Sequence, residues 1–355
     1  MRKSVGLAVV AGAASVFVSS AAQAAVIGQW IGSSGGTWST STNWQGGVIP
    51  NGQGDTAQYS PPSTASNITV NDVAGGVTVG TLKVNITTNA SWQITPNTSV
   101  FLDQDGAGPL SASVINDIQS TTTTGNPAIF LNVGSGGNFV LQDNLLVSNT
   151  SNSTRTSGAV QIRGVLTGVG NIRIENVSNN FAAAQVAITS PGNNYAGNTT
   201  IAKGATTFNR GDSFTPSPGN TVIIGAAGMG DATLMFVGGG VGNMENQFAS
   251  AAGSGGTLVF GMSGTQSGPV TIKPSSRTST FTLNGDLNFS NPSTTQLFTI
   301  GTPIAGTGKL IKVGAGAMRV DRVRGAQPVD TVASHEADTP SETVLDQPIP
   351  EDDEP

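Results

Sequence analysis

Short runs in which apolar and polar residues alternate recur through most of this chain. Each run is bounded by Gly, Asn, Asp, Pro or Ser. Alternation with a period of two between turn-forming residues predicts β-strands rather than helices. The predicted strands are 68–70, 77–84, 91–94, 99–102, 128–133, 138–141, 145–148, 160–165, 171–174 and 185–188.

Several of these pieces resemble one another. Residues 193–208, NNYAGNTTIAKGATTF, and 306–320, GTGKLIKVGAGAMRV, each join a Gly-bearing turn to short strands, and 168–174, GVGNIRI, is a weaker copy. One such unit cannot bury an apolar face alone, whereas stacked units cover each other's cores. We therefore predict an all-β fold, a right-handed parallel β-helix or β-solenoid. A two-sheet antiparallel sandwich is the alternative.

The stretch 30–59 differs from the rest because it holds three of the four tryptophans, Trp30, Trp38 and Trp44. A solenoid exposes its apolar core at each end, and an open end invites edge-to-edge association. Tryptophan buries a large area while its indole N–H can still find a partner. We therefore predict that residues 25–60 form an N-terminal cap and first rung, followed by a solenoid of degenerate repeats over 61–320.

The order of features GGTW, NW, GG, P and GD-A within 30–59 resembles the start of bacterial autotransporter-associated β-strand repeat proteins. Residues 193–208 and 306–320 resemble the two halves of the repeat in that family. The resemblance covers most of 30–320. It implies a secreted or cell-surface β-solenoid, a passenger-like stalk or matrix protein with an adhesive or scaffolding use.

The two ends of the chain have compositions of their own. Residues 1–24 combine Arg2 and Lys3 with an apolar stretch and a small-x-small site at 22–24, which predicts a cleaved signal peptide; a retained membrane anchor is the alternative. Residues 321–355 have no aromatic residue, five prolines and ten acidic residues against two basic ones, which predicts a disordered acidic tail. We expect export to the extracellular space or outer cell surface, with the periplasm as alternative.

Composition narrows the classes of partner. Residues 25–320 carry 11 acidic and 11 basic residues, so the body is neutral and has no electrostatic footprint for nucleic acid. The chain has no cysteine, which excludes disulfides and thiolate metal sites. We expect partners among cell-surface or extracellular polysaccharides and other surface proteins, and no transmembrane segment after signal removal.

The sequence offers only weak candidates for a catalytic, metal-binding or phosphate-binding site. Residues 32–36 match the G-x-S-x-G expression of a hydrolase nucleophile, but no helix follows and the single histidine, His335, lies in the predicted tail. Residues 103–106, Asp-Gln-Asp-Gly, resemble half of a calcium loop, yet no Glu follows at the required distance. The Gly-rich pieces 238–240 and 253–256 lack the Lys-Ser/Thr of a phosphate loop and are interpreted as corners. We predict no catalytic, metal or cofactor residues.

The competing hypothesis is a polysaccharide-binding or polysaccharide-degrading β-helix. Hydrolysis needs paired carboxylates, and stacking of rungs could bring Asp212, Asp231 and Glu245 together. Binding could use a row of exposed aromatic residues that stack on sugar rings. The candidates for that row are Trp38, Trp44, Trp92 and Tyr195. We favour burial of these four residues and a non-catalytic structural or adhesive role.

Overall fold

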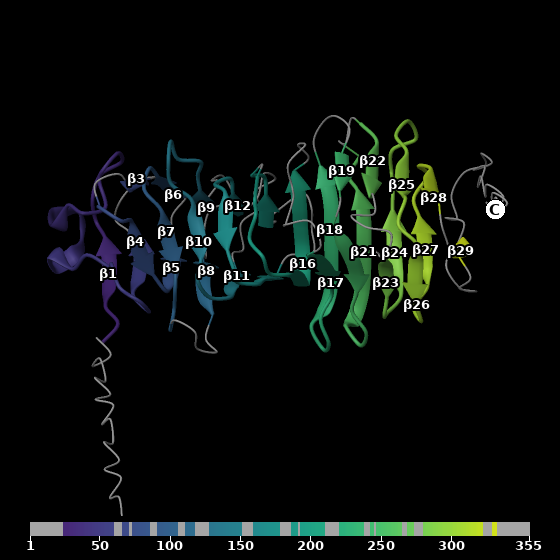
Figure 1. Cartoon of the computed structure of the whole chain (residues 1–355), viewed down its shortest axis with the longest axis horizontal. Helices are drawn as coiled ribbons and strands as arrows, with labels where there is room; N and C mark the ends of the chain where they lie inside the picture. The colour runs from purple at the N-terminus through teal and green to yellow at the C-terminus, as the bar shows by residue number, and fades with distance from the viewer. Residues whose placement is uncertain are drawn as a thin grey trace, which may run out of the picture.

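The chain forms a parallel β-solenoid with a long axis along which the strands lie side by side (Figure 1). The computed structural model describes residues 24–59, 66–70, 73–85, 91–105, 111–117, 128–150, 159–177, 186–190, 192–209, 220–237, 242–244, 246–264, 268–272, 280–321 and 329–331. The predicted signal peptide, except Ala24, lies outside these residues. Every pair of neighbouring strands in the described sheets is parallel, which excludes the antiparallel sandwich.

Most coils contribute one strand in turn to each of three faces, although among the described residues the coils that begin at β1, β14 and β16 have no strand on face 3. Face 1 contains β1 (Ile27–Trp30), β2 (Thr56–Tyr59), β5 (Thr81–Val84), β8 (Ala112–Asn116), β11 (Leu145–Asn149), β14 (Ile172–Asn176), the first part of β16 (Thr199–Asn209), β17 (Thr221–Ile224), β20 (Gln247–Ser250), β23 (Phe281–Leu283) and β26 (Ile304–Gly306). Ten steps of roughly 4.8 Å between these strands give a rod roughly 48 Å long.

Face 2 contains β3 (Ser66–Val70), β6 (Ser91–Pro96), β9 (Ala128–Leu131), β12 (Val160–Ile162), β15 (Val186–Ile188), the second part of β16, β18 (Gly230–Val237), β21 (Gly255–Met262), β24 (Leu287–Ser290), β27 (Leu310–Val313) and β29 (Val329–Thr331). Face 3 is made of two four-stranded sheets. Its strands are β4 (Val77–Val79), β7 (Val100–Leu102), β10 (Phe139–Leu141) and β13 (Leu166–Gly168), then β19 (Gly242–Met244), β22 (Val270–Ile272), β25 (Phe298–Ile300) and β28 (Met318–Val320). Two 3-10 turns, η1 (Ser41–Asn43) and η2 (Gln45–Gly47), lie between β1 and β2.

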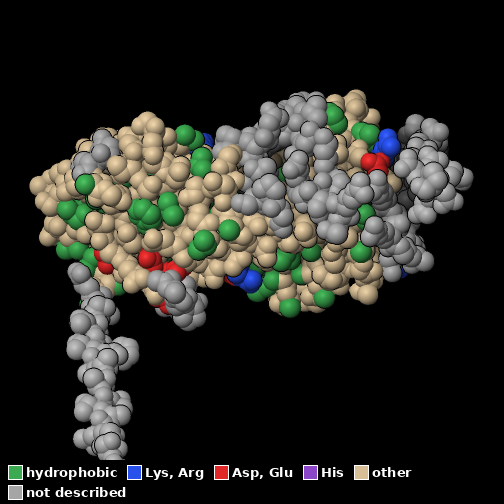
Figure 2. Space-filling view, in the orientation of Figure 1, with side chains coloured by type: hydrophobic (Ala, Val, Ile, Leu, Met, Phe, Trp, Pro, Cys, Tyr) green, Lys and Arg blue, Asp and Glu red, His purple; other side chains and the backbone are tan. Residues whose placement is uncertain are grey.

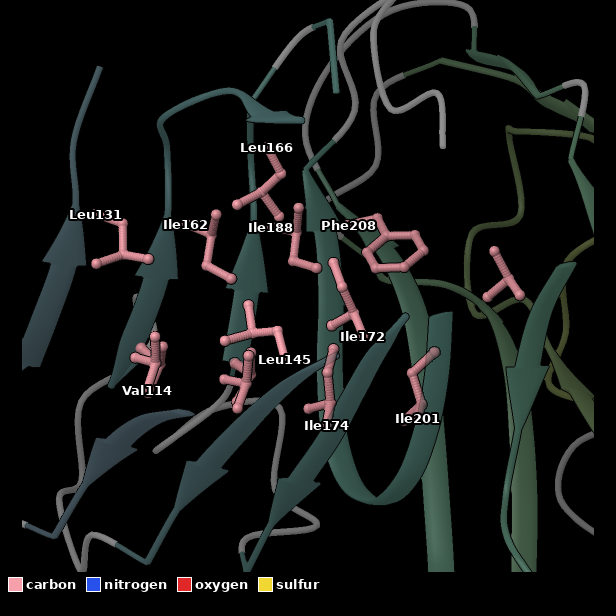
Figure 3. Packing of buried hydrophobic residues seen from close by; sticks show 14 of the residues in the cluster. Val114, Leu131, Leu145, Ile162, Leu166, Ile172, Ile174, Ile188, Ile201 and Phe208 are labelled. Atoms are coloured by element: carbon pink, nitrogen blue, oxygen red, sulfur yellow. The ribbon is translucent and has the colours of Figure 1, made fainter. Parts of the chain in front are cut away.

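The core is built of columns, because strands in register place equivalent inward residues above one another. Alternation along each strand sends every second side chain inward, as in the buried–half-buried pattern of β11 and β14. Figure 3 shows two such columns in the middle of the rod, one on face 1 and one on face 2. Their members are Val114, Val147, Ile174 and Ile201, and Leu131, Ile162, Ile188 and Phe208.

An asparagine ladder runs inside the core at the corner where face 1 turns into face 2. Asn116 donates from Nδ2 to Asn149 Oδ1 (2.8 Å), and Asn149 donates in the same way to Asn176 Oδ1 (2.8 Å). All three side chains are buried. Asn149 and Asn176 each donate and accept, which satisfies amide groups that would otherwise be costly to bury, whereas Asn116 at the start of the ladder donates but its Oδ1 has no partner among the described residues.

The inner ladder ends at the coil of β16, in which the chain has no separate corner between face 1 and face 2. Asn176 Nδ2 donates to the carbonyl of Ala205 (2.8 Å) in β16, which passes from face 1 to face 2 without interruption. Gly204 has a φ of +73°, and a Cβ there would lie 2.1 Å from the Asn176 carbonyl oxygen. Only glycine fits this combination of backbone and space.

The predicted strands are confirmed, with shorter bounds at some ends. The run 77–84 is two strands, β4 and β5, because the chain turns a corner at Gly80. The run 160–165 ends as a strand at Ile162. Of the predicted disordered tail over 321–355, residues 322–328 and 332–355 lie outside the described residues, and residues 329–331 form β29, whose backbone extends face 2 beside β27.

Candidate functional site

The aromatic residues considered for sugar stacking all lie in the core. Trp38, Trp92 and Tyr195 have no exposed surface and Trp44 is 1% exposed. A sugar ring can stack only on an aromatic face that solvent reaches. The hypothesis of a row of exposed aromatics at these four positions is therefore wrong, and their predicted burial is confirmed.

Three tryptophans instead form a compact cluster between β1 and β2. The Trp44 ring lies edge-on to Trp30 (centroids 5.1 Å apart) and to Trp38 (5.0 Å apart). Each of two indole N–H groups finds a backbone acceptor: Trp38 Nε1 donates to the Pro50 carbonyl (2.9 Å), and Trp44 Nε1 donates to the Trp38 carbonyl (2.7 Å). The cluster thus fills the first coil and leaves no indole face for a ligand.

The coil geometry brings Asp143 to the turn that carries Asp103 and Asp105. Oδ2 of Asp143 accepts the backbone N–H groups of Gln104 (2.5 Å) and Asp105 (3.1 Å). The Asp143 side chain is nearly buried. Burial raises its pKa above 3.8, the two backbone hydrogen bonds oppose that rise, and the charges of Asp103 and Asp105 add to it. Sequence analysis missed Asp143 because it is distant from the pair in the chain.

The turn at 103–105 is held by the Asp143 carboxylate together with hydrogen bonds to Gln53 and Gly54. Oδ1 of Asp103 accepts from Gln53 Nε2 (3.0 Å), and the Asp103 carbonyl accepts from the Gly54 N–H (3.0 Å). Across the described part of the chain, no three His, Cys, Asp or Glu side chains are grouped so that they could hold a metal ion. The structure gives the calcium-loop hypothesis no ligand set here, and Gly106 lies outside the described residues.

Asp143→Asn is expected to make the protein more stable at pH 7 and no different at pH 3. An amide oxygen can accept the same two N–H groups without adding a third negative charge, so we expect a gain of ~0.5 kcal/mol at neutral pH. The pKa of Asp143 is raised in the folded state, so a protonated Asp143 carboxyl favours folding. This contribution to the free energy of unfolding is complete below pH 3.8 and is lost as the pH rises through the raised pKa.

Denaturant unfolding of both proteins between pH 3 and pH 7 measures this difference. Asp143→Ala serves as the companion variant, because it loses both hydrogen bonds and should be less stable at every pH. Identical pH dependence in the wild type and Asp143→Asn would contradict a pKa of Asp143 that is raised by burial and by the charges of Asp103 and Asp105.

The other proposed carboxylates do not form a site in the described residues. Asp231 Oδ1 accepts the N–H of Thr257 (2.7 Å) in the next coil, so it links the starts of β18 and β21. Asp212 and Glu245 lie outside the described residues, and so does His335. The structure therefore describes only Asp231 of these three residues.

The glycine-rich segments that are described form turns. After β1, the segment 32–36 bends back so that the Gly35 N–H reaches the Asn67 carbonyl (2.7 Å), and Gly35 has a φ of +84°. No helix starts there, so the nucleophile-elbow context is missing. Residues 253–256 stack on the corner of the preceding coil, where the N–H of Gly228 donates to the Gly253 carbonyl (2.8 Å). Residues 238–240 lie outside the described residues.

A second asparagine ladder lies on the outside of the rod, just before the strands of face 1. Asn171 donates from Nδ2 to Asn144 Oδ1 (2.8 Å), and its own Oδ1 accepts the N–H of Asn198 (2.8 Å). Asn198 Oδ1 then accepts the N–H of Thr221 (2.9 Å). These side chains satisfy the backbone groups at the corner, and their positions follow the coils at intervals of 27, 27 and 23 residues.

The outer surface has few charges. Figure 2 shows a face on which Lys, Arg, Asp and Glu are sparse, with the visible acidic side chains of the described part mostly along the lower edge of the N-terminal half. In one column of face 1, exposed Ile27 is followed by half-buried Thr56 and Thr81 and by buried Ser113, and the last two share a hydroxyl hydrogen bond (3.0 Å). The surface is thus mainly uncharged and polar.

Comparison of the chain with protein-family models, with curated proteins and with solved structures gives no match. No helix among the described residues is long and apolar enough to cross a membrane.

Proposed function

We propose that this protein is a non-catalytic structural or adhesive β-solenoid, exported to the cell surface or beyond it. The observation that supports the proposal best is the unbroken parallel ladder of face 1, which runs from β1 to β26 around a closed core. Such a ladder makes a stiff spacer, since each coil is hydrogen-bonded to the coils on either side. A spacer of this kind suits a stalk or a matrix component.

The surface supports the adhesive part of the proposal. Outward-facing hydroxyl and amide groups, such as those of Thr56, Thr81 and the outer asparagine ladder, carry donors and acceptors without net charge. Polar groups on several coils let several weak contacts act together on a repetitive ligand. We propose neutral extracellular polysaccharide or surface protein as that ligand.

Localisation tests the proposal directly. In a bacterial host we expect the mature protein, starting at Ala25, in the extracellular or outer-surface fraction, with its N-terminus established by mass spectrometry. Val9→Glu together with Val10→Glu breaks the apolar stretch of the predicted signal and should leave an uncleaved, cell-retained chain. Wild-type protein found in the cytoplasm at its full length would contradict the proposal.

Adhesion and turnover are separate measurements on the purified protein. We expect the immobilised folded protein to retain cells or polysaccharide, and a heat-unfolded sample to retain much less. Release of reducing ends from a panel of polysaccharides should stay at background. Measurable turnover would contradict a non-catalytic role.

A further inference from the structure

The two ends of the solenoid differ in which residues cover their outermost strands. At the N-terminal end, segment 35–38 lies beside β3, where the Trp38 N–H donates to the Thr69 carbonyl (3.1 Å). On face 3, Asn51 Oδ1 accepts the Thr78 N–H (3.0 Å) in β4. Residues between β1 and β2 therefore occupy backbone positions beside the first strands of two faces, and this end is capped.

At the other end the last complete coil consists of β26, β27 and β28. Within the described residues, β26 pairs only with β23, and β28 pairs only with β25. β27 has a strand on both sides, because β29 pairs with it in parallel register. One face of the last coil is thus extended by a strand that comes from beyond the repeats.

Two inward side chains of this last coil are nearly as buried as those in the middle of the rod. Ile304 is 3% exposed and Leu310 is 2% exposed. Met318 and Val320 on β28, which has no such neighbour in the described residues, are only half-buried. An inward residue of an uncovered final coil would have water on its far side, so the burial of Leu310 on β27 agrees with the cover that β29 gives this strand.

The distribution of charge also favours the acidic C-terminal segment as the part of the chain that covers this end of the solenoid. Residues 301–320 carry Lys309, Lys312 and Arg319 and no acidic residue, whereas residues 321–355 carry ten acidic and two basic residues. Lys312 is paired in register with Thr331 of β29. The positive last coil and the acidic segment that follows it are complementary, and they are joined in one chain.

We propose that the C-terminal end of the solenoid is a strand-acceptor surface and that its occupant is the segment after Asp321, which docks through β29 onto β27. In this arrangement the acidic segment is the second cap of the rod. Backbone pairing supplies the attachment, as in other cases of strand addition, and the opposite charges fix which strand is accepted. The inference does not depend on the proposed function.

The test uses the full chain with Val329→Pro and Asp330→Pro together. Successive N–H groups of a strand point to opposite sides, so this pair removes the donor that faces β27. The control replaces the same two residues by alanine, which keeps both N–H groups. Hydrogen exchange of residues 309–321 and the sedimentation of each protein over a range of concentrations are measured.

We expect amides in residues 309–321 to exchange at least about tenfold faster in the proline variant than in the wild type or the alanine control. The proline variant should also self-associate as its concentration rises, because the edge of β27 is then open to a second copy. Unchanged exchange and an unchanged sedimentation coefficient in the proline variant would overturn the proposal. Equal effects of proline and alanine would overturn backbone pairing as the means of docking.

Discussion

Asn149→Ala is expected to lower the free energy of unfolding by about 3–5 kcal/mol. The variant removes two hydrogen bonds of the inner ladder, from Asn116 Nδ2 and to Asn176 Oδ1, in a place where all three side chains are buried. Water cannot replace the lost partner without entering the core. The loss therefore includes the cost of burying weakly satisfied amide groups and the cavity left by the side chain.

The outer ladder provides a matched control for this prediction. Asn171 also makes two ladder hydrogen bonds, with Asn144 and Asn198, but its side chain is exposed to solvent. We expect Asn171→Ala to cost less than about 1 kcal/mol, since water can take the place of either partner. Urea unfolding of both variants gives the comparison, and equal losses would mean that burial does not decide the value of a ladder bond in this protein.

Trp44→Ala is expected to destabilise the fold by about 3–5 kcal/mol, before any effect on binding is measurable. Trp44 is buried, packs edge-on against Trp30 and Trp38, and donates to the Trp38 carbonyl. Its loss opens a large cavity in the first coil and weakens the cover over the core behind it. Trp38→Ala should act similarly, because Trp38 joins the cluster to Pro50.

Ile27→Ala is the control for the tryptophan variants. Ile27 lies on β1 in the same coil but is 67% exposed, so truncating it should change stability by no more than about 0.5 kcal/mol. Thermal unfolding followed by tryptophan fluorescence and by circular dichroism measures all three proteins. A melting temperature that is unchanged in both tryptophan variants would show that the cluster does not support the coil.

The fold could be predicted from sequence because its rules are local. Alternation with turn residues marks the strands, and the weak similarity of 193–208 to other segments indicates stacking. The concentration of Trp30, Trp38 and Trp44 near the start marks the end that needs cover. None of these inferences required knowledge of which residues lie beside one another in different coils.

The features that were missed depend on the register between coils. The inner ladder of Asn116, Asn149 and Asn176 was not predicted, because nothing local distinguishes an asparagine at a strand end that points inward from one that points outward. Asp143 was overlooked for the same reason, since only the coil pitch places it beside Asp103 and Asp105. Coil lengths vary through insertions, so the register could not be counted from the sequence alone.

The outer ladder implies that whole coils can be added to or removed from the middle of the rod in evolution while both ends stay the same. Asn144 and Asn171 occupy equivalent positions one coil apart, and the strands that follow them, β11 and β14, are in register residue for residue. Removing residues 145–171 would join Asn144 directly to Ile172, the residue that already follows Asn171. Gene duplication or deletion can therefore change the length of the rod, measured from the tryptophan cluster to the last coil, by one coil at a time.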